Sequence, residues 1–245
     1  MAILWVAMSF SVDNENKGKL TINLEHYVGL RSLRMDSVLY KNEAGQLFTI
    51  TNFKYYISNI HLKKADLPNG QADGKEFISP DHFLITEENE SSKHFSLNNI
   101  PNGEYTSMSF ILGVDSIHNC SGAQSGALDP VNGMFWAWNT GYIFLKLEGK
   151  ASVSTSPGHI FEFHIGGYKQ PSNCIRAVTL NFNEKVKIDN NNPSVSIKAD
   201  ASEVLKTPTT IDLSKLSSVT DFHNAAMIAD NYKDMFSIIK VTNEK

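Results

Sequence analysis

The 245-residue sequence lacks the features that mark nucleic-acid-binding and membrane-spanning proteins. Its 22 basic and 26 acidic residues leave a net charge of −4 and are scattered, so no basic stripe could follow a phosphate backbone. The only near-continuous apolar run, residues 2–10, is far too short to span a bilayer. We therefore expect neither nucleic acid as a partner nor a transmembrane segment.

The motifs of common enzymes are also missing. The chain has no GxSxG elbow, no glycine-rich phosphate loop before a helix, and no Cys-His signature of a thiol enzyme. Nor does it contain the HExxH spacing of a zinc protease. These absences favour a binding protein over an enzyme.

Cysteine is scarce. Cys120 and Cys174 lie far apart and lack the CxxC spacing of a zinc or thioredoxin site. A chain of this length can bury a sufficient core without disulfides. In an exported protein such a pair predicts a disulfide, and two isolated buried thiols are the alternative.

The first residues indicate export. The apolar run is followed by the polar tract "SVDNENKGK", which is typical of a signal remnant and linker, although the positive segment that normally precedes such a run is missing. A first strand is the alternative. We expect a leader over residues 1–18, a single domain over residues 19–245, and a periplasmic or extracellular protein, with a lipid anchor as a further option.

What the chain does have is a series of short segments with period-two alternation. In "LTINLEH" the residues Leu20, Ile22, Leu24 and His26 share one face. Similar segments along the chain predict further strands. One predicted helix, "DFHNAAMIADNYKDMF", precedes the last strand. This pattern predicts an all-β sandwich with one short C-terminal helix; the strand segments are 20–26, 45–62, 82–86, 100–114, 142–149, 159–167, 175–182, 194–200 and 237–242.

Residues 115–141 interrupt the alternation and predict a long ordered loop. Loops of this length in a compact domain are usually functional or disordered, and the aromatic cluster around "MFWAW" argues against disorder. Trp136 and Trp138 would share a face if the segment is extended. They are either packing anchors or the wall of a site.

Eight histidines could supply metal ligands, but only if the fold brings distant strands together. His26 ends an apolar row, and His164 alternates with Phe161, Phe163 and Ile165. For each of these two histidines a hydrogen-bonded structural role is the alternative to metal binding.

The segments "LGVDSIHNCSGAQSGALDPVNGMFWAWNTGYIFLKLEG" and "FEFHIGGY" resemble the MbnP-like family of methanobactin-associated copper-binding proteins. "INLEHYVG", "NFKYYISNIHL" and "PNGEY" extend the resemblance over nearly the whole chain after Leu20. It implies an exported β-sandwich that binds one copper ion through histidine. It also implies a tryptophan oxidised to kynurenine by a partner, a di-haem enzyme of the cytochrome c peroxidase type.

By position, the resemblance makes His26, His164 and Trp136 or Trp138 the candidate copper ligands, with His82 and His118 as weaker ones. Imidazole suits copper, and kynurenine would add an amine and a ketone as donors. The two cysteines depart from the family pattern; they would form a local bridge or, if reduced, bind copper themselves.

Two other functions stay open. A surface module could bind a peptide, glycan or other small ligand at the aromatic loop without metal. A copper-dependent enzyme would need an open coordination position and access for a substrate. The sequence shows neither an open coordination position nor access for a substrate. We therefore expect a protein that acquires, stores or delivers copper.

Overall fold

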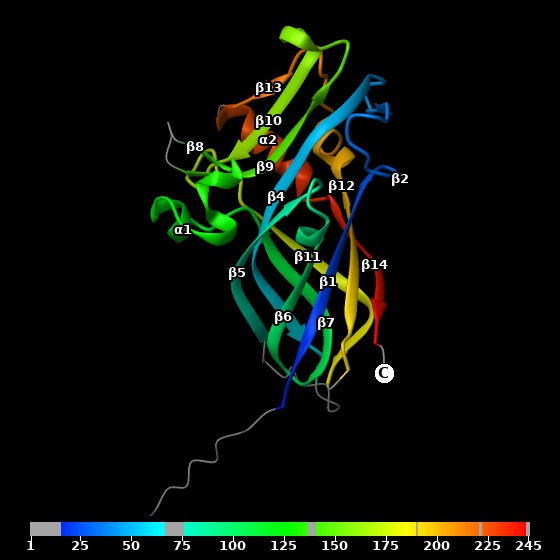
Figure 1. The fold of residues 1–245 in the computed structure, drawn as a ribbon, viewed down its shortest axis with the longest axis vertical. Helices are drawn as coiled ribbons and strands as arrows, with labels where there is room; N and C mark the ends of the chain where they lie inside the picture. The colour runs from blue at the N-terminus through cyan, green and yellow to red at the C-terminus, as the bar shows by residue number, and fades with distance from the viewer. Residues whose placement is uncertain (1–15, 67–75, 137–140, 190, 221, 244–245) are drawn as a thin grey trace, which may run out of the picture.

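The computed structural model describes residues 16–66, 76–136, 141–189, 191–220 and 222–243. Two sheets face each other, which confirms the predicted all-β sandwich (Figure 1). The small sheet has the order β14-β12-β1-β2, with β6 also paired to β1. Its strands are β1 (Lys17–Val28), β2 (Arg31–Ser32), β6 (His94–Pro101), β12 (Ser194–Asp200) and β14 (Phe236–Thr242).

The large sheet has the order β11-β7-β4-β9-β10-β13, and β3, β5 and β8 pair at its sides. Its long central strand β4 supports several neighbours in turn: β9 along its first half and β5 and β7 along its second. The strands are β3 (Tyr40–Lys41), β4 (Leu47–Lys64), β5 (Glu76–Thr86), β7 (Gly103–Leu112), β8 (Phe135–Trp136), β9 (Gly141–Lys150), β10 (Ile160–Gly166), β11 (Arg176–Ile188) and β13 (Ser218–Val219).

Helical elements are short. The predicted C-terminal helix is α2 (Phe222–Tyr232), which lies beside β10 and β13 in Figure 1. A second helix, α1 (Ser116–Cys120), lies in the predicted aromatic loop, where the sequence showed no helical period. The 3-10 turns are η1 (Glu90–Lys93), η2 (Gly126–Leu128), η3 (Pro130–Asn132), η4 (Pro157–His159) and η5 (Ala201–Leu205).

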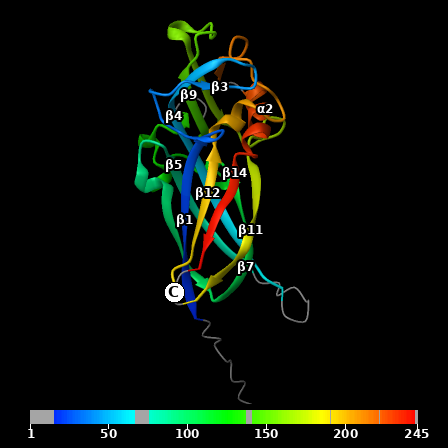
Figure 2. The ribbon, with the colours of Figure 1, turned by 90° about the vertical axis from the view of Figure 1, so that its right-hand side faces the viewer.

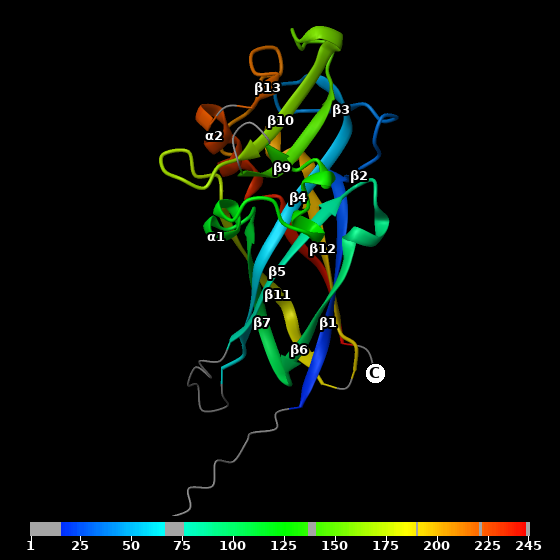
Figure 3. The same cartoon turned by 60° about the vertical axis from the view of Figure 1, so that its left-hand side comes forward.

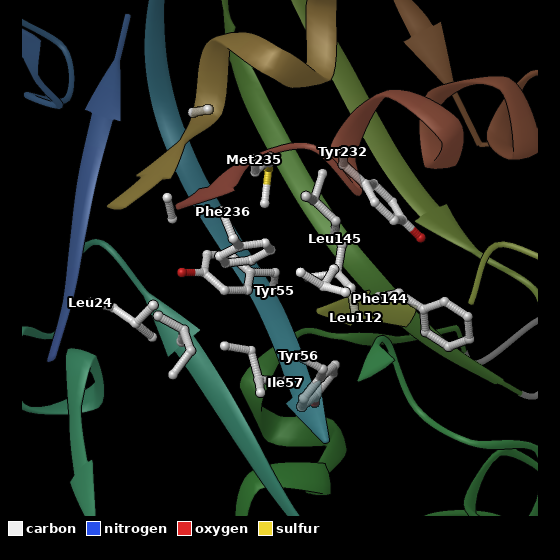
Figure 4. Close-up of a cluster of buried hydrophobic side chains, with 14 of the residues drawn as sticks. Leu24, Tyr55, Tyr56, Ile57, Leu112, Phe144, Leu145, Tyr232, Met235 and Phe236 are labelled. Carbon is white, nitrogen blue, oxygen red and sulfur yellow. The ribbon is translucent and has the colours of Figure 1, made fainter. Parts of the chain in front are cut away.

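Alternation explains how the sheets meet. In β1 the side chains of Leu20, Ile22 and Leu24 are buried, while the residues between them face outward. Figure 2 shows β1, β12 and β14 side by side in the small sheet, and Figure 4 shows the aromatic core beneath it, where Tyr55 lies beside Phe236. Packing of these two inner faces forms the core.

The domain begins slightly before its predicted start. Strand β1 starts at Lys17, inside the predicted 1–18 leader, because its first residues pair with the end of β6. The rest of the leader, residues 1–15, lies outside the described residues. No helix in the described part of the chain is long and apolar enough to cross a membrane.

His26 forms a buried polar link between the two sheets. Its Nδ1 lies 2.7 Å from Glu87 Oε2 and its Nε2 lies 2.9 Å from the Tyr55 hydroxyl. Lys93 Nζ donates to the same Glu87 oxygen at 3.2 Å. Burial lowers the pKa of His26, more than the Glu87 carboxylate raises it. A neutral ring that donates from Nδ1 and accepts at Nε2 satisfies both partners.

Both ring nitrogens of His26 are therefore used within the protein. The hydrogen bonds of His26 favour the structural alternative named above, because a metal ion would have to displace Glu87 or Tyr55 from a fully buried side chain. The ligand role of His26 stays a prediction.

We predict that His26→Ala lowers the free energy of unfolding by about 2–4 kcal/mol, because it leaves a cavity and removes the hydrogen-bond partner of the buried Tyr55 hydroxyl, whereas Glu87 keeps Lys93. Tyr55→Phe, which removes one hydroxyl, should cost about 1 kcal/mol. Urea denaturation measures both. His94→Ala, a change at an exposed histidine, is the control. A His26→Ala protein as stable as this control would contradict the structural role.

Candidate metal centre

The aromatic loop spans residues 115–141, and its described part, residues 115–136, lies across the outer face of the large sheet, the face turned away from the small sheet (Figures 1 and 3). Two bonds from outward-facing side chains of the sheet hold it there. The Tyr56 hydroxyl donates to the Ala127 carbonyl at 2.9 Å, and Lys146 Nζ donates to the Gly133 carbonyl at 2.8 Å. The loop is therefore ordered over its described residues, as the sequence predicted.

The loop begins with a capped turn. Asp115 Oδ1 accepts from the backbone N–H groups of Ile117 and His118 at 3.0 and 3.1 Å, which starts α1. The buried Asn119 side chain accepts from the Tyr142 N–H at 3.0 Å. The Tyr142 hydroxyl in turn donates to the Leu128 carbonyl at 2.8 Å. These bonds attach the start of the loop to the strand that follows it.

Trp136 packs against the backbone of β10. It lies in β8, which pairs with the start of β9, and is 7% exposed. Its ring closes on Gly166: a Cβ there would lie 2.7 Å from Trp136 Cζ3. Gly166 follows His164 by two residues in β10. The second tryptophan, Trp138, lies outside the described residues.

His164 is held by a carboxylate. Its Nε2 lies 2.6 Å from Glu148 Oε1, and the other Glu148 oxygen accepts from Asn52 Nδ2 at 3.0 Å. The hydrogen bond from His164 holds the pKa of Glu148 at about 2. Nδ1 of His164 makes no hydrogen bond to any described residue, so this ring nitrogen is the one through which His164 could bind a ligand.

His82, the weaker sequence candidate, lies in a different cluster. With Asp115 and His118 it forms the one group of three or more metal-ligand side chains found among the described residues, with ligand atoms within 4.8 Å of one another. Burial and the neighbouring His118 lower the pKa of His82. Its ring is therefore neutral at pH 7 and able to act as a ligand.

The fold does not bring all the predicted ligands together. His26 faces the core, whereas His164 and His82 lie on the outer face, near opposite ends of the aromatic loop. Sequence reasoning missed Asp115 and Glu148. The signal that could have identified Asp115 is its residue type, because aspartate is a preferred N-cap directly before a helical turn. For Glu148 the alternation of β9 predicts only that the side chain faces outward, and it does not predict a histidine partner.

The predicted disulfide is not formed. Both cysteines are free: Cys120 is exposed with its Sγ 3.2 Å from the Tyr168 hydroxyl, and Cys174 is buried with its Sγ 3.5 Å from the Ser172 carbonyl. Burial raises the pKa of the Cys174 thiol to about 12. The Cys174 thiol therefore stays protonated and packs as a small apolar side chain, which is the alternative given above for a buried cysteine.

A model of the MbnP family matches residues 17–224. The chain belongs to the MbnP family. Among solved structures it is similar to MbnP from Methylosinus trichosporium, with a TM-score of 0.51 and 12% sequence identity, over 81% of this chain and 80% of that one. At this identity the likeness shows a shared fold. No curated protein matches the chain.

In this MbnP-family chain, Gly166→Ala should displace Trp136, because the added methyl would overlap its ring and the Tyr142 carbonyl. We expect a loss of about 1–3 kcal/mol in stability and a red shift of tryptophan emission. Gly122→Ala, where nothing lies within 4 Å but φ is +75°, controls for backbone cost alone. Unchanged emission in Gly166→Ala would contradict the packing of Trp136 on β10.

Glu148 should make the stability of this MbnP-family chain depend on pH. Because its folded pKa of about 2 lies below the ordinary 4.5, it stabilises the fold above pH 4.5, and this contribution disappears as the pH falls toward 2. We expect about 1–2 kcal/mol, discounted for partial exposure of Glu148. Glu148→Gln should remove this slope from denaturation curves measured between pH 2 and pH 5. A slope equal to that of the parent would show that Glu148 is not its source.

Proposed function

We propose that this MbnP-family chain is an exported copper-binding protein that holds one copper(I) ion at His164, beside the aromatic loop. One observation carries the proposal: the Trp136 ring rests on Gly166, two residues beyond His164 on the same strand. The two motifs on which the copper resemblance rests are therefore in contact in the fold.

The donor chemistry at His164 fits copper. Imidazole is a good ligand for copper, and metal-binding histidines usually hydrogen-bond a carboxylate through the nitrogen that does not bind the metal. Glu148 takes this place at Nε2 and leaves Nδ1 for the ion. Bound copper would supply a Lewis-acidic, redox-active centre. The protein would orient the imidazole, and the loop would shield the ion from water.

One histidine needs further donors, and the aromatic loop is where they would come from. An indole ring is a poor ligand, whereas kynurenine carries an amine and a ketone. We propose that Trp136 or Trp138 is converted by an oxidising partner, a di-haem enzyme of the cytochrome c peroxidase type. Trp136 in β8 lies next to the strand that holds His164, which supports it as one of the two targets.

The proposed role is acquisition, storage or delivery of copper, without catalysis of its own. Export of the protein would suit this role, and the apolar run of residues 2–10 followed by a polar tract is the pattern of an export signal. It also suits a histidine on a rigid strand, because β10 holds the His164 ring in place whether or not the ion is present.

An anaerobic copper(I) competition titration on protein purified from its native host tests the proposal, and we expect one ion per chain. His164→Ala should weaken binding about 100-fold or more, and Glu148→Gln about 10-fold, since Glu148 only orients the ring. His94→Ala, at an exposed histidine, should bind as the parent does. Mass spectrometry of peptides that contain Trp136 and Trp138 identifies any kynurenine. Equal affinity in His164→Ala and His94→Ala would refute the site.

A second function, binding of a peptide or glycan by the aromatic loop, is favoured by two exposed apolar side chains. Ile117 is 75% and Val131 84% exposed on the aromatic loop. A module of this kind needs no metal, so parent protein without copper affinity above that of exposed histidines would support it over the copper function.

A further inference from the structure

We propose that His82, Asp115 and His118 form a second metal site, specific for a divalent ion of the zinc type, which fastens helix α1 to strand β5. The three side chains come from two parts of the chain: His82 lies in β5, whereas Asp115 is the N-cap of α1 and His118 lies within that helix. Asp115 Oδ2 lies 2.7 Å from His118 Nδ1 and 3.3 Å from His82 Nε2. The proposal stands independently of copper binding at His164.

The strongest sign of a ligand is the unsatisfied nitrogen of His82. The side chain is 8% exposed, and its Nε2 is buried without a hydrogen-bond partner among the described residues. Although Asp115 Oδ2 lies 3.3 Å away, the two atoms lack the alignment of a hydrogen bond. Buried polar atoms without partners are rare in folded proteins, and a metal ion would satisfy this one.

The acidic member of the cluster is preorganised. Its Oδ1 is occupied by two backbone N–H groups of α1, so the Asp115 carboxylate cannot turn freely and presents Oδ2 to both imidazoles. The rings of His82 and His118 already lie close, with centroids 4.3 Å apart at an angle of 60°. The free energy needed to assemble the ligands is therefore small.

The donor set selects the kind of ion. Two imidazoles and one carboxylate are the ligands of three-residue zinc sites, whereas copper(I) prefers softer donors without a carboxylate. His82 also lines a surface cleft of about 390 Å³ between β5, η1 and the loop. A water molecule or a small ligand from this cleft could complete a four-coordinate ion.

The site is separate from His164. His164 is opposite Lys146, Lys146 opposite Lys54, and Lys54 opposite Thr86, so three strand spacings, or about 14 Å, divide His164 from β5. His82 lies four residues further along β5. No ligand is shared between the two sites.

Titration of the untagged, metal-stripped full chain with Zn²⁺ in a calorimeter tests the proposal. We expect one ion per chain and a rise in melting temperature on binding. His82→Ala and His118→Ala should each weaken Zn²⁺ binding by about tenfold or more. His61→Ala is the matched control, because His61 is an exposed histidine beside Glu76 on the neighbouring strand.

The visible spectrum with bound Co²⁺ separates a metal ligand from a residue that only supports the fold. Co²⁺ should give the intense visible bands of a four-coordinate site in the parent and in His61→Ala, and these bands should disappear in His118→Ala. The half-exposed His118 can be replaced with little effect on packing, so His118→Ala carries the test if His82→Ala does not fold.

His164→Ala separates this proposal from the copper function. It should leave Zn²⁺ affinity unchanged, whereas His82→Ala should leave copper(I) affinity unchanged. Zn²⁺ affinity that is the same in the parent, His118→Ala and His61→Ala would overturn the second site, whatever the copper titration shows.

Discussion

The hydrogen bonds of the Asn119 side chain hold the aromatic loop on the outer face of the large sheet, and the rest of that face depends on them. It is 3% exposed, donates to the carbonyls of Val114 and Asp115, and accepts from the Tyr142 N–H. One amide group thus satisfies backbone atoms at both ends of a long loop, and without it these groups would be buried unpaired. By fixing where α1 begins and where β9 begins, Asn119 determines which side chains the loop places on the sheet.

Both proposed metal sites depend on this one arrangement. At one end, the loop returns to β9 through β8 and lays Trp136 on the strand that carries His164. At the other, the first turn of α1 brings a carboxylate and an imidazole over His82. In each site one histidine comes from a strand of the large sheet, which is the rigid partner, and the loop adds the remaining chemistry. Strand β4 connects the outer face with the interior: Tyr56 binds the loop, and its neighbour Tyr55 binds His26 in the core.

Most of the fold could be predicted because strand formation leaves a local signal. Side chains alternate between the two faces of a strand, so a row such as Leu20, Ile22 and Leu24 marks a buried face without knowledge of the partner strand. The segment 194–200 is β12 with the predicted bounds, and the C-terminal helix is present as α2. Helix α1 was missed because a helix of five residues is too short to show a period.

By itself, the sequence determined the sandwich and the ordered aromatic loop, and its resemblance to the MbnP family made His164 and Trp136 candidate copper-site residues. The tertiary structure decided which histidines are available to a metal. His26 and His164 both occupy alternating strands, but only the packing of the sheets turns His26 toward Glu87 and Tyr55. Asp115, His118 and His82 form a cluster only because the loop folds back over β5. The reason is physical: burial and hydrogen-bond partners depend on contacts between residues far apart in the chain, which local alternation does not encode.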